Sequence, residues 1–95
     1  MEQSITIKIA GKQYPLKAKT PEMERLIRLS ADSINRQMTA YSTRYPDSKS
    51  EDRITFVAIN ESAARIAAES RLKALEEEIA SLKASTQAYL EKNLK

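Results

Sequence analysis

Two clusters of carboxylates are the residues whose types and spacing could support chemistry. Glu51-Asp52 follows a break between two helical segments, and Glu76-Glu77-Glu78 lies in the C-terminal half of the chain. Neighbouring carboxylates can act as a general acid and base or bind a divalent metal ion. Such roles need a concave, desolvated setting, whereas the first cluster falls in the first turn of a predicted helix and the second on a solvated flank. We therefore interpret both clusters as structural.

The amino-acid inventory excludes most other catalytic mechanisms. The 95 residues include no Cys and no His, which removes thiolate nucleophiles, imidazole bases, disulfides and the usual zinc ligand sets. A single Gly cannot build a glycine-rich phosphate-binding loop. An enzyme subunit would need carboxylates that converge in a pocket, and the pattern indicates none. The sequence predicts a protein that is not an enzyme and uses no cofactor, metal or small-molecule substrate.

An arginine stripe is the second feature of interest. Arg28, Asp32 and Arg36 follow one another at intervals of four, so they would share a helix face and form an internal salt bridge. Such a face is usually only solvated, but Arg is also favoured in protein interfaces. Four further basic residues could belong to a docking surface: Arg25, Lys12, Arg44 and Arg53.

Positive charge is concentrated in the N-terminal half, where residues 1–50 carry nine Lys and Arg against five Asp and Glu. The net charge of the whole chain is only +3. This excess leaves open a basic nucleic-acid-binding or generic scaffold module as the alternative function. The tyrosines do not alternate with basic residues, and Tyr14, Tyr41 and Tyr45 more often close a small core than stack on bases.

The N-terminal residues predict a β-hairpin over residues 4–18. Ile5, Ile7 and Ile9 alternate with polar residues, which places them on the buried face of a strand. Gly11-Lys12 is expected to form the turn, and Pro15 is expected at an edge because it cannot donate to a ladder. An isolated hairpin is marginal in water, so another element must cover its isoleucine face.

A helix over residues 21–44 is the nearest cover for that face. Thr20 is a suitable N-cap, and Pro21 suits the first helical position. The segment Tyr45-Pro46-Asp47-Ser48 ends the helix within a loop over residues 45–50. The helix carries an apolar stripe composed of Met23, Leu26, Ile27, Ile34, Met38 and Tyr41.

A second helix is expected from Ser50, as N-cap, to about Leu94, because no Gly or Pro interrupts the chain there. Roughly 43 helical residues span about 65 Å, more than a small head can cover. We therefore expect the distal half to pack on other copies of the chain. The predicted fold is α+β, mainly α. It has a basic head over residues 1–50 and a long helix over residues 51–95 that packs on the head first and then forms a coiled coil.

Apolar residues of the long helix predict where copies of the chain meet. Between residues 54 and 68 they occupy two faces, and from Leu72 onward they narrow to the three-and-four spacing of a left-handed coiled coil, which Thr86 weakens. Asn60 would either fix helix register or bond to the backbone of the head. The residues predicted to mediate oligomerisation are Ile5, Ile7, Ile9, Ile54, Val57, Ala58, Asn60, Ala64, Ala68, Leu72, Leu75, Ile79, Leu82 and Tyr89.

Four short motifs follow one another along the chain. They are Ile7-Lys8-Ile9-Ala10-Gly11-Lys12, the helix led by Pro21 with Ala31-Asp32-Ser33-Ile34-Asn35, the helix start at Glu51, and Phe56-Val57-Ala58-Ile59-Asn60. Their combination in this order resembles the ZapA family of bacterial cell division proteins, which associate with the tubulin-like GTPase FtsZ. Ala10 departs from the family pattern, in which a bulky apolar residue often precedes the Gly.

The resemblance implies dimers whose heads join through the hairpins and the base of the long helix, with two dimers paired by antiparallel coiled coils. Such a tetramer would cross-link FtsZ filaments and stabilise the division ring at midcell. No secretory signal and no stretch of membrane-spanning length is evident, so we expect a cytoplasmic protein with no membrane partner. Because the positive charge is small and unclustered, nucleic acid is the less favoured partner. The resemblance places the filament contact at Lys12, Arg44 and Glu51. The exposed stripe adds Arg25, Arg28 and Arg36.

Overall fold

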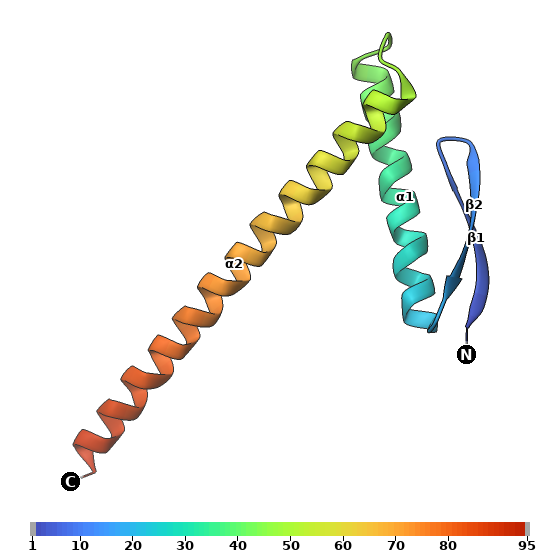
Figure 1. Ribbon diagram of the computed structural model, residues 1–95. Coiled ribbons are helices and arrows are strands. Elements are labelled where there is room, and N and C mark those ends of the chain that lie inside the picture. The colour runs from blue at the N-terminus through green and yellow to red at the C-terminus, as the bar shows by residue number, and fades with distance from the viewer. Residues whose placement is uncertain (1, 95) are drawn as a thin grey trace. The chain divides into compact units, whose positions relative to one another are not determined.

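A computed structural model of the chain describes residues 2–94 as a β-hairpin followed by two helices (Figure 1). This architecture confirms the predicted α+β, mainly α, fold. Met1 and Lys95, which the predicted head and long helix included, lie outside the described residues. The elements are β1 (Gln3–Ile9), β2 (Lys12–Ala18), α1 (Pro21–Arg44) and α2 (Ser50–Asn93).

The chain divides into two compact units, the first ending at Ile59 and the second beginning at Asn60. The first unit therefore includes the hairpin, α1 and the first turns of α2. The second unit consists of the remaining part of α2. Within the described residues, no helix is long and apolar enough to cross a membrane.

The hairpin has one apolar face and one polar face, as the alternating sequence predicts. β1 and β2 pair antiparallel, with Ile5 opposite Leu16 and Ile7 opposite Tyr14. Paired residues point to the same side of a sheet, so the isoleucines of β1 share a face with the apolar residues of β2. The other face carries Ser4, Thr6 and Lys8 with their partners Lys17, Pro15 and Gln13. Lys12 and Gln3, the partners of Ile9 and Ala18, lie at the two ends of the apolar face.

The turn of the hairpin is Ala10-Gly11, and the predicted turn Gly11-Lys12 is wrong by one residue. Ile9 pairs with Lys12, which is the first residue of β2. Ala10 has φ 52° and Gly11 has φ 85°. Two left-handed residues in a two-residue loop are the geometry of a type I′ turn, which matches the twist of the flanking strands.

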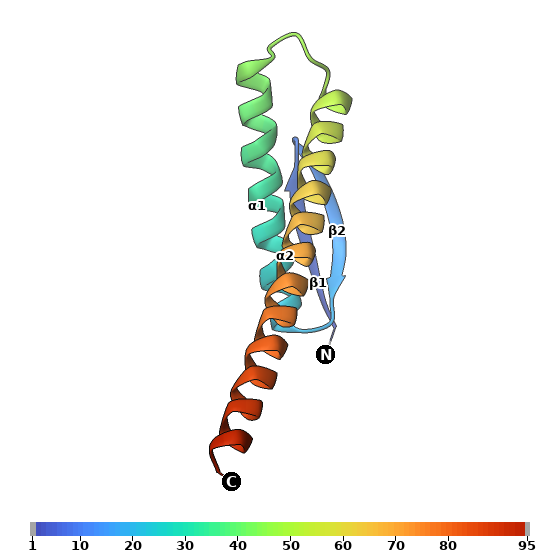
Figure 2. The ribbon, with the colours of Figure 1, turned by 90° about the vertical axis from the view of Figure 1, so that its left-hand side faces the viewer.

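α1 begins and ends where the local signals predicted. The Thr20 Oγ1 accepts a hydrogen bond from the main-chain N–H of Met23 at 3.0 Å, and Pro21 is the first helical residue. At the other end, the N–H of Tyr45 donates to the carbonyl of Tyr41 at 2.8 Å. α1 lies alongside the hairpin, closer to β1 than to β2 (Figure 2).

α2 begins at Ser50, which is therefore the first helical residue and not the predicted N-cap. The main-chain N–H groups of Asp52 and Arg53 both donate to the carbonyl of Lys49 at 3.1 Å, which identifies Lys49 as the residue before the helix. Glu51 and Asp52 occupy the first turn, where negative charge complements the helix dipole.

The core of the first unit is thin: α1 packs on the hairpin, and the start of α2 contributes one buried residue. Its buried apolar residues are Ile5, Ala18, Ala31, Met38 and Val57. Val57, which is only 2% exposed, is the buried residue of α2. In the second unit, every described side chain from Asn60 to Leu94 is exposed.

Candidate functional site

The tip of the hairpin is fixed to α1 by one side chain. The Asn35 Nδ2 donates to the main-chain carbonyl of Lys8 at 2.7 Å, and the main-chain N–H of Ala10 donates to the Asn35 Oδ1 at 3.1 Å. Both polar atoms of the amide are therefore used. Because Lys12 follows the turn directly, its position relative to α1 depends on these two hydrogen bonds.

The Asn35 contact also explains why Pro15 is tolerated in the hairpin. In an antiparallel pair, residues alternate between those that bond across the ladder and those that direct their N–H and C=O outward. The Lys8 carbonyl is directed at Asn35, so Lys8 and, two residues earlier, Thr6 face outward. Pro15 is the partner of Thr6 and therefore lacks only an outward N–H. The predicted edge location of Pro15 is confirmed.

A groove beside the hairpin tip brings together two of the predicted filament-contact residues, Lys12 and Glu51. It has a volume of about 370 Å³ and lies entirely within the first unit. Opposite charges on its rim and apolar residues along its wall are typical of a protein-binding surface. Its remaining lining residues are Ile9, Ala10, Tyr14, Met38, Ser50 and Ile54.

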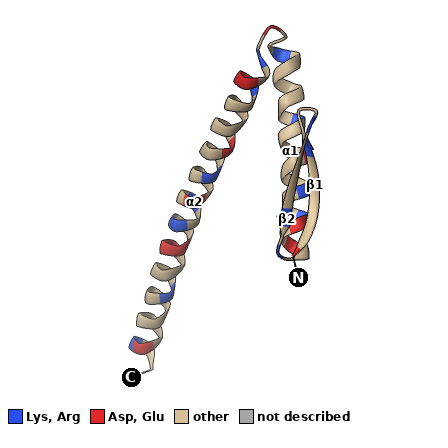
Figure 3. Cartoon of the chain, turned by 45° about the vertical axis from the view of Figure 1, so that its right-hand side comes forward, with Lys and Arg blue, Asp and Glu red and all other residues tan. Residues whose placement is uncertain are grey.

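The arginines of α1 do not join this groove. The Arg28 Nε contacts the Glu24 Oε2 at 3.1 Å, so the predicted salt bridge within the stripe is wrong: Arg28 pairs with Glu24 in place of Asp32. Arg25 and Arg36 are exposed. Arg25 precedes Asn35 by ten residues, or about 15 Å along the helix axis. The basic residues are therefore distributed along α1 and not gathered at one point (Figure 3).

The loop between the helices is fixed by Arg53, which was predicted to extend the basic surface. Its Nε donates to the Ser48 Oγ at 2.9 Å and its Nη2 donates to the Pro46 carbonyl at 3.3 Å. The partly buried guanidinium of Arg53 therefore stabilises the loop between the helices by these two hydrogen bonds. Arg44, by contrast, is exposed and lies 5.7 Å from the centre of the Tyr45 ring.

Tyr41 and Tyr45 form an aromatic cluster with Phe56 at the end of the head. The ring centre of Tyr41 lies 5.5 Å from that of Phe56 and 6.5 Å from that of Tyr45. These spacings are typical of packed aromatic pairs. Of the three tyrosines predicted to close a small core, Tyr41 is partly buried, whereas Tyr14 and Tyr45 are 43% and 48% exposed.

The apolar face of the hairpin is covered on one side only. Ile5 of β1 is buried, whereas Tyr14 and Leu16 of β2 are 43% and 40% exposed. α1 has an uncovered flank as well, because Met23 and Leu26 of the predicted stripe are exposed. Sequence reasoning missed two residues of this helix, the buried Ala31 and the exposed Leu29.

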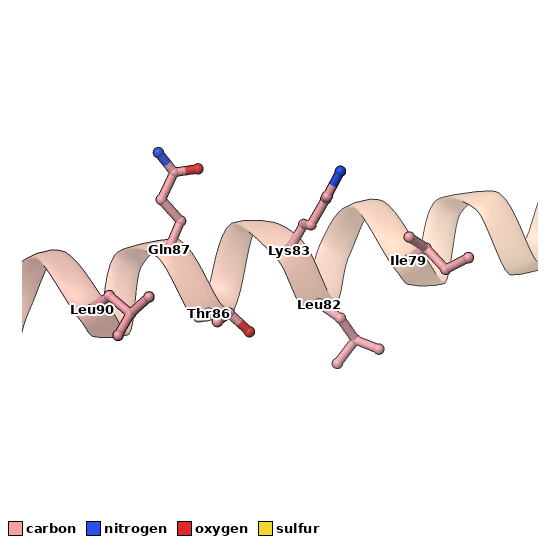
Figure 4. Close-up of a pocket in the computed structure, with 6 residues that line it drawn as sticks. All are labelled: Ile79, Leu82, Lys83, Thr86, Gln87 and Leu90. Carbon is pink, nitrogen blue, oxygen red and sulfur yellow. The ribbon is translucent and has the colours of Figure 1, made fainter.

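The seam of α2 is a further uncovered apolar surface. Its five apolar residues from Leu72 to Tyr89 are between 50% and 67% exposed. Around Ile79 and Leu82 the surface forms a shallow groove of about 460 Å³ that also includes Leu90, which sequence reasoning missed. Figure 4 shows Leu82 and Lys83 extending from opposite sides of the helix.

The carboxylates of the second cluster lie on the surface of α2, where Glu76, Glu77 and Glu78 are all exposed. Within residues 2–94, no group of three acidic side chains is placed to hold a metal ion. The uncovered surfaces among these residues include a mixed-charge groove and an open hairpin face on the head, and an apolar seam on the long helix.

The chain matches a protein-family model over most of its length. The model described as cell division protein ZapA matches residues 5–93, which is nearly the whole chain and includes both surfaces of the head and the seam. No curated protein and no solved structure gives a significant match.

Proposed function

We propose that this chain, which belongs to the ZapA family of cell division proteins, binds FtsZ filaments and cross-links or bundles them. It would act by presenting paired heads on a coiled-coil oligomer at the midcell division ring, in the cytoplasm. One observation carries this proposal: the seam of α2 places leucine and isoleucine side chains at coiled-coil spacing, and all of them are exposed in a single chain.

Burial of the seam by other copies would supply the driving force for assembly. Fully burying a Leu or Ile side chain contributes about 1.5–3 kcal/mol. Leu72, Leu75, Ile79 and Leu82 are each at least half exposed, and an isolated helix gains nothing from them. When two chains pair along the seam, these four residues become buried in both copies.

The open half of the hairpin supports pairing of the heads. Tyr14 and Leu16 of β2 form an apolar surface that is 43% and 40% exposed, and α1 lies closer to β1 than to β2. A two-stranded sheet gains stability when its apolar face is covered. The residues proposed for this contact are Ile7 and Ile9 of the hairpin, with Ile54, Ala58, Asn60, Ala64 and Ala68 along the start of the long helix. Ile5 and Val57, which are buried within the single chain, would support the contact from beneath.

The groove at the hairpin tip is the proposed centre of the filament contact. Lys12 and Glu51 meet there, on a surface that Asn35 fixes in place. Arg44 and the exposed Arg25, Arg28 and Arg36 would extend the contact along α1. Each contact between a head and a filament can be weak. Two linked heads that bind to the same filament bundle are held there more tightly than one head alone.

The experiment that tests this function combines sedimentation with purified FtsZ polymers and electron microscopy of the filaments. The wild-type chain should sediment with the polymers and bundle them, and a gel shift with duplex DNA should show no complex. Ile79→Glu places a charge in the seam and should abolish bundling while the heads stay folded. Ala84→Glu adds the same charge on the outer side of the helix and should leave bundling unchanged.

Failure has two distinguishable forms. If the wild-type chain stays in the supernatant while FtsZ polymers sediment, the proposed partner is wrong. If Ile79→Glu bundles filaments as well as Ala84→Glu does, the partner stands but the seam has no part in the assembly.

A further inference from the structure

Tyr45 is a half-exposed aromatic residue that belongs neither to the groove at the hairpin tip nor to the seam of α2. It follows the last residue of α1 directly and lies within the first unit. Its side chain is 48% exposed. It adjoins Arg44, which already belongs to the proposed filament contact, so about half of an aromatic side chain is open to a partner at that point.

The main chain of Tyr45 is fixed on both sides. Its N–H donates to the carbonyl of Tyr41 at 2.8 Å. Its carbonyl accepts two hydrogen bonds from Ser48, one from the main-chain N–H at 3.1 Å and one from the Oγ at 2.6 Å. The next residue, Pro46, has a restricted φ, and its carbonyl accepts a hydrogen bond from the Arg53 guanidinium. The loop therefore sets the direction of the Tyr45 side chain before any partner binds.

The ring of Tyr45 is held in place as well. It stacks on Tyr41 with 6.5 Å between the ring centres and an interplanar angle of 20°, and Tyr41 in turn packs on Phe56. The guanidinium carbon of Arg44 lies 5.7 Å from the centre of the Tyr45 ring, which is within the range of a cation–π interaction. A partner that contacts this ring would therefore lose little side-chain entropy on binding.

Arg44 and Tyr45 are residue types that often carry much of the binding energy of a protein interface. The tyrosine ring offers an apolar face, and the guanidinium can donate two parallel hydrogen bonds to a carboxylate. Among the described residues, no acidic side chain forms a salt bridge with Arg44. The charge of Arg44 is therefore available to a carboxylate of a partner.

We propose that Arg44 and Tyr45 form a contact site for the FtsZ filament in which the ring of Tyr45 is the anchor. The matching surface of the filament would offer an apolar or proline side chain to the open part of the ring and a carboxylate to Arg44. This inference rests on the proposed function. It adds an apolar anchor to a contact otherwise assigned to charged residues, and it is continuous with that contact because Arg44 belongs to both.

Two other occupants fit the Arg44–Tyr45 site less well. Single-stranded nucleic acid binds along a basic groove with several aromatic platforms. Here the neighbouring Tyr41 is partly buried, and Asp47 adds a negative charge to the same loop. A second copy of the chain is proposed to meet the head at the open hairpin face and the start of α2, and neither surface includes Tyr45.

Quantitative sedimentation of the full chain with FtsZ polymers tests the role of Tyr45. Tyr45→Ala removes the ring and should raise the dissociation constant at least tenfold, as expected for a hot-spot residue. Tyr45→Phe keeps the ring and should stay within about threefold of the wild type. The matched control is Leu29→Ala, which removes a side chain of similar exposure, 50%, from the N-terminal half of α1 and should leave the affinity unchanged.

Stability and mass separate a filament contact from a structural role of Tyr45. Tyr45→Ala also uncovers Tyr41 and should lower the urea midpoint of unfolding, while light scattering returns the wild-type mass. Ala31→Gly destabilises α1 at a buried position and should leave filament binding unchanged. Equal loss of binding in Ala31→Gly and Tyr45→Ala would mean that the loss reflects stability and not a contact.

Coupling between Arg44 and Tyr45 gives an independent test. Because the guanidinium lies beside the ring, the two side chains should contact the same part of the filament, and their effects should not multiply. The double variant Arg44→Ala with Tyr45→Ala should bind more tightly than the product of the two single losses predicts. Losses that multiply would mean that the two side chains do not form one site.

The ways in which this inference can fail are distinguishable. If the wild-type chain does not sediment with FtsZ polymers, the proposed function and the inference fail together. If the wild type and Tyr45→Ala bind equally well, the proposed function stands and Tyr45 is not an anchor. Equal loss in Tyr45→Phe and Tyr45→Ala would overturn a contact through the ring. Binding of a single-stranded oligonucleotide that Tyr45→Ala abolishes, with sedimentation unchanged, would assign the site to nucleic acid instead.

Discussion

The side-chain amide of Asn35 donates to the main-chain carbonyl of Lys8 at 2.7 Å, and so joins the middle of α1 to the end of β1. The same amide accepts a hydrogen bond from the main-chain N–H of Ala10, the first residue of the turn. Lys12, which is proposed to contact the filament, follows that turn. The geometry of the proposed contact surface therefore depends on a residue that does not belong to it.

Replacing Asn35 should loosen the hairpin tip. Asn35→Ala removes two hydrogen bonds and should lower the free energy of unfolding by about 1–2 kcal/mol. Asn35→Asp keeps an acceptor for Ala10 but faces the Lys8 carbonyl with a carboxylate, so it should not restore stability. Urea denaturation measures the stability, and amide hydrogen exchange at Ala10 measures the local opening.

The neighbouring Arg36→Ala is the matched control, because Arg36 is exposed on the same helix. It should change stability by less than about 0.5 kcal/mol. Equal stability of Asn35→Ala and Arg36→Ala, with Ala10 still protected from exchange, would mean that the hairpin tip is held by packing alone.

Replacing the turn residue Ala10 should increase the stability of the protein. Its φ of 52° is in the left-handed region, where Asn is tolerated much better than Ala, and Asn-Gly is the favoured type I′ sequence. Ala10→Asn should therefore raise the free energy of unfolding by roughly 0.5–1 kcal/mol, measured by urea denaturation.

Gly11→Ala is the companion variant. A Cβ at residue 11 would meet no atom within 4 Å, so only its φ of 85° opposes the substitution. A loss of about 1 kcal/mol is expected. If Ala10→Asn destabilises the protein and Gly11→Ala is neutral, the type I′ assignment does not hold.

Reversing charge at the head should weaken filament binding without changing the assembly. Lys12→Glu combined with Arg44→Glu should reduce the amount of chain that sediments with FtsZ polymers, because both residues belong to the proposed contact and neither lies on the seam. Light scattering should return the wild-type mass. Lys17→Glu combined with Lys19→Glu makes the same charge change elsewhere on the head and serves as control.

Unaltered sedimentation of the Lys12 and Arg44 variant would rule out the basic-head model. Equal loss in the Lys17 and Lys19 control would show that the net charge of the head matters and not the groove.

The fold could be predicted closely from the sequence because its boundaries are local. Thr20 and Pro21 specify the start of α1, and Pro46 lies just after its end. Period-two isoleucines specify β1, and the lack of Gly or Pro specifies a long α2. The predicted position of the turn was wrong by one residue. The first residue of the turn is Ala10, and alanine is a poor residue for the left-handed region that it occupies.

The candidate site was less predictable, because its contacts join residues far apart in the chain. The role of Asn35 depends on atoms of Lys8 and Ala10, which no local pattern connects to it. Arg28 had acidic residues four positions away on both sides. It pairs with Glu24, and an acidic residue N-terminal to a basic one is the more favourable order on a helix. That rule could have identified the pair.

The central claim is that α2 is shared between chains, and the mass of the wild-type protein tests it most directly. Light scattering coupled to gel filtration, over a wide range of concentrations and without FtsZ, should give at least twice the 10.7 kDa of one chain. A single folded species of 10.7 kDa at the highest concentration, with full helical circular dichroism, would contradict the account.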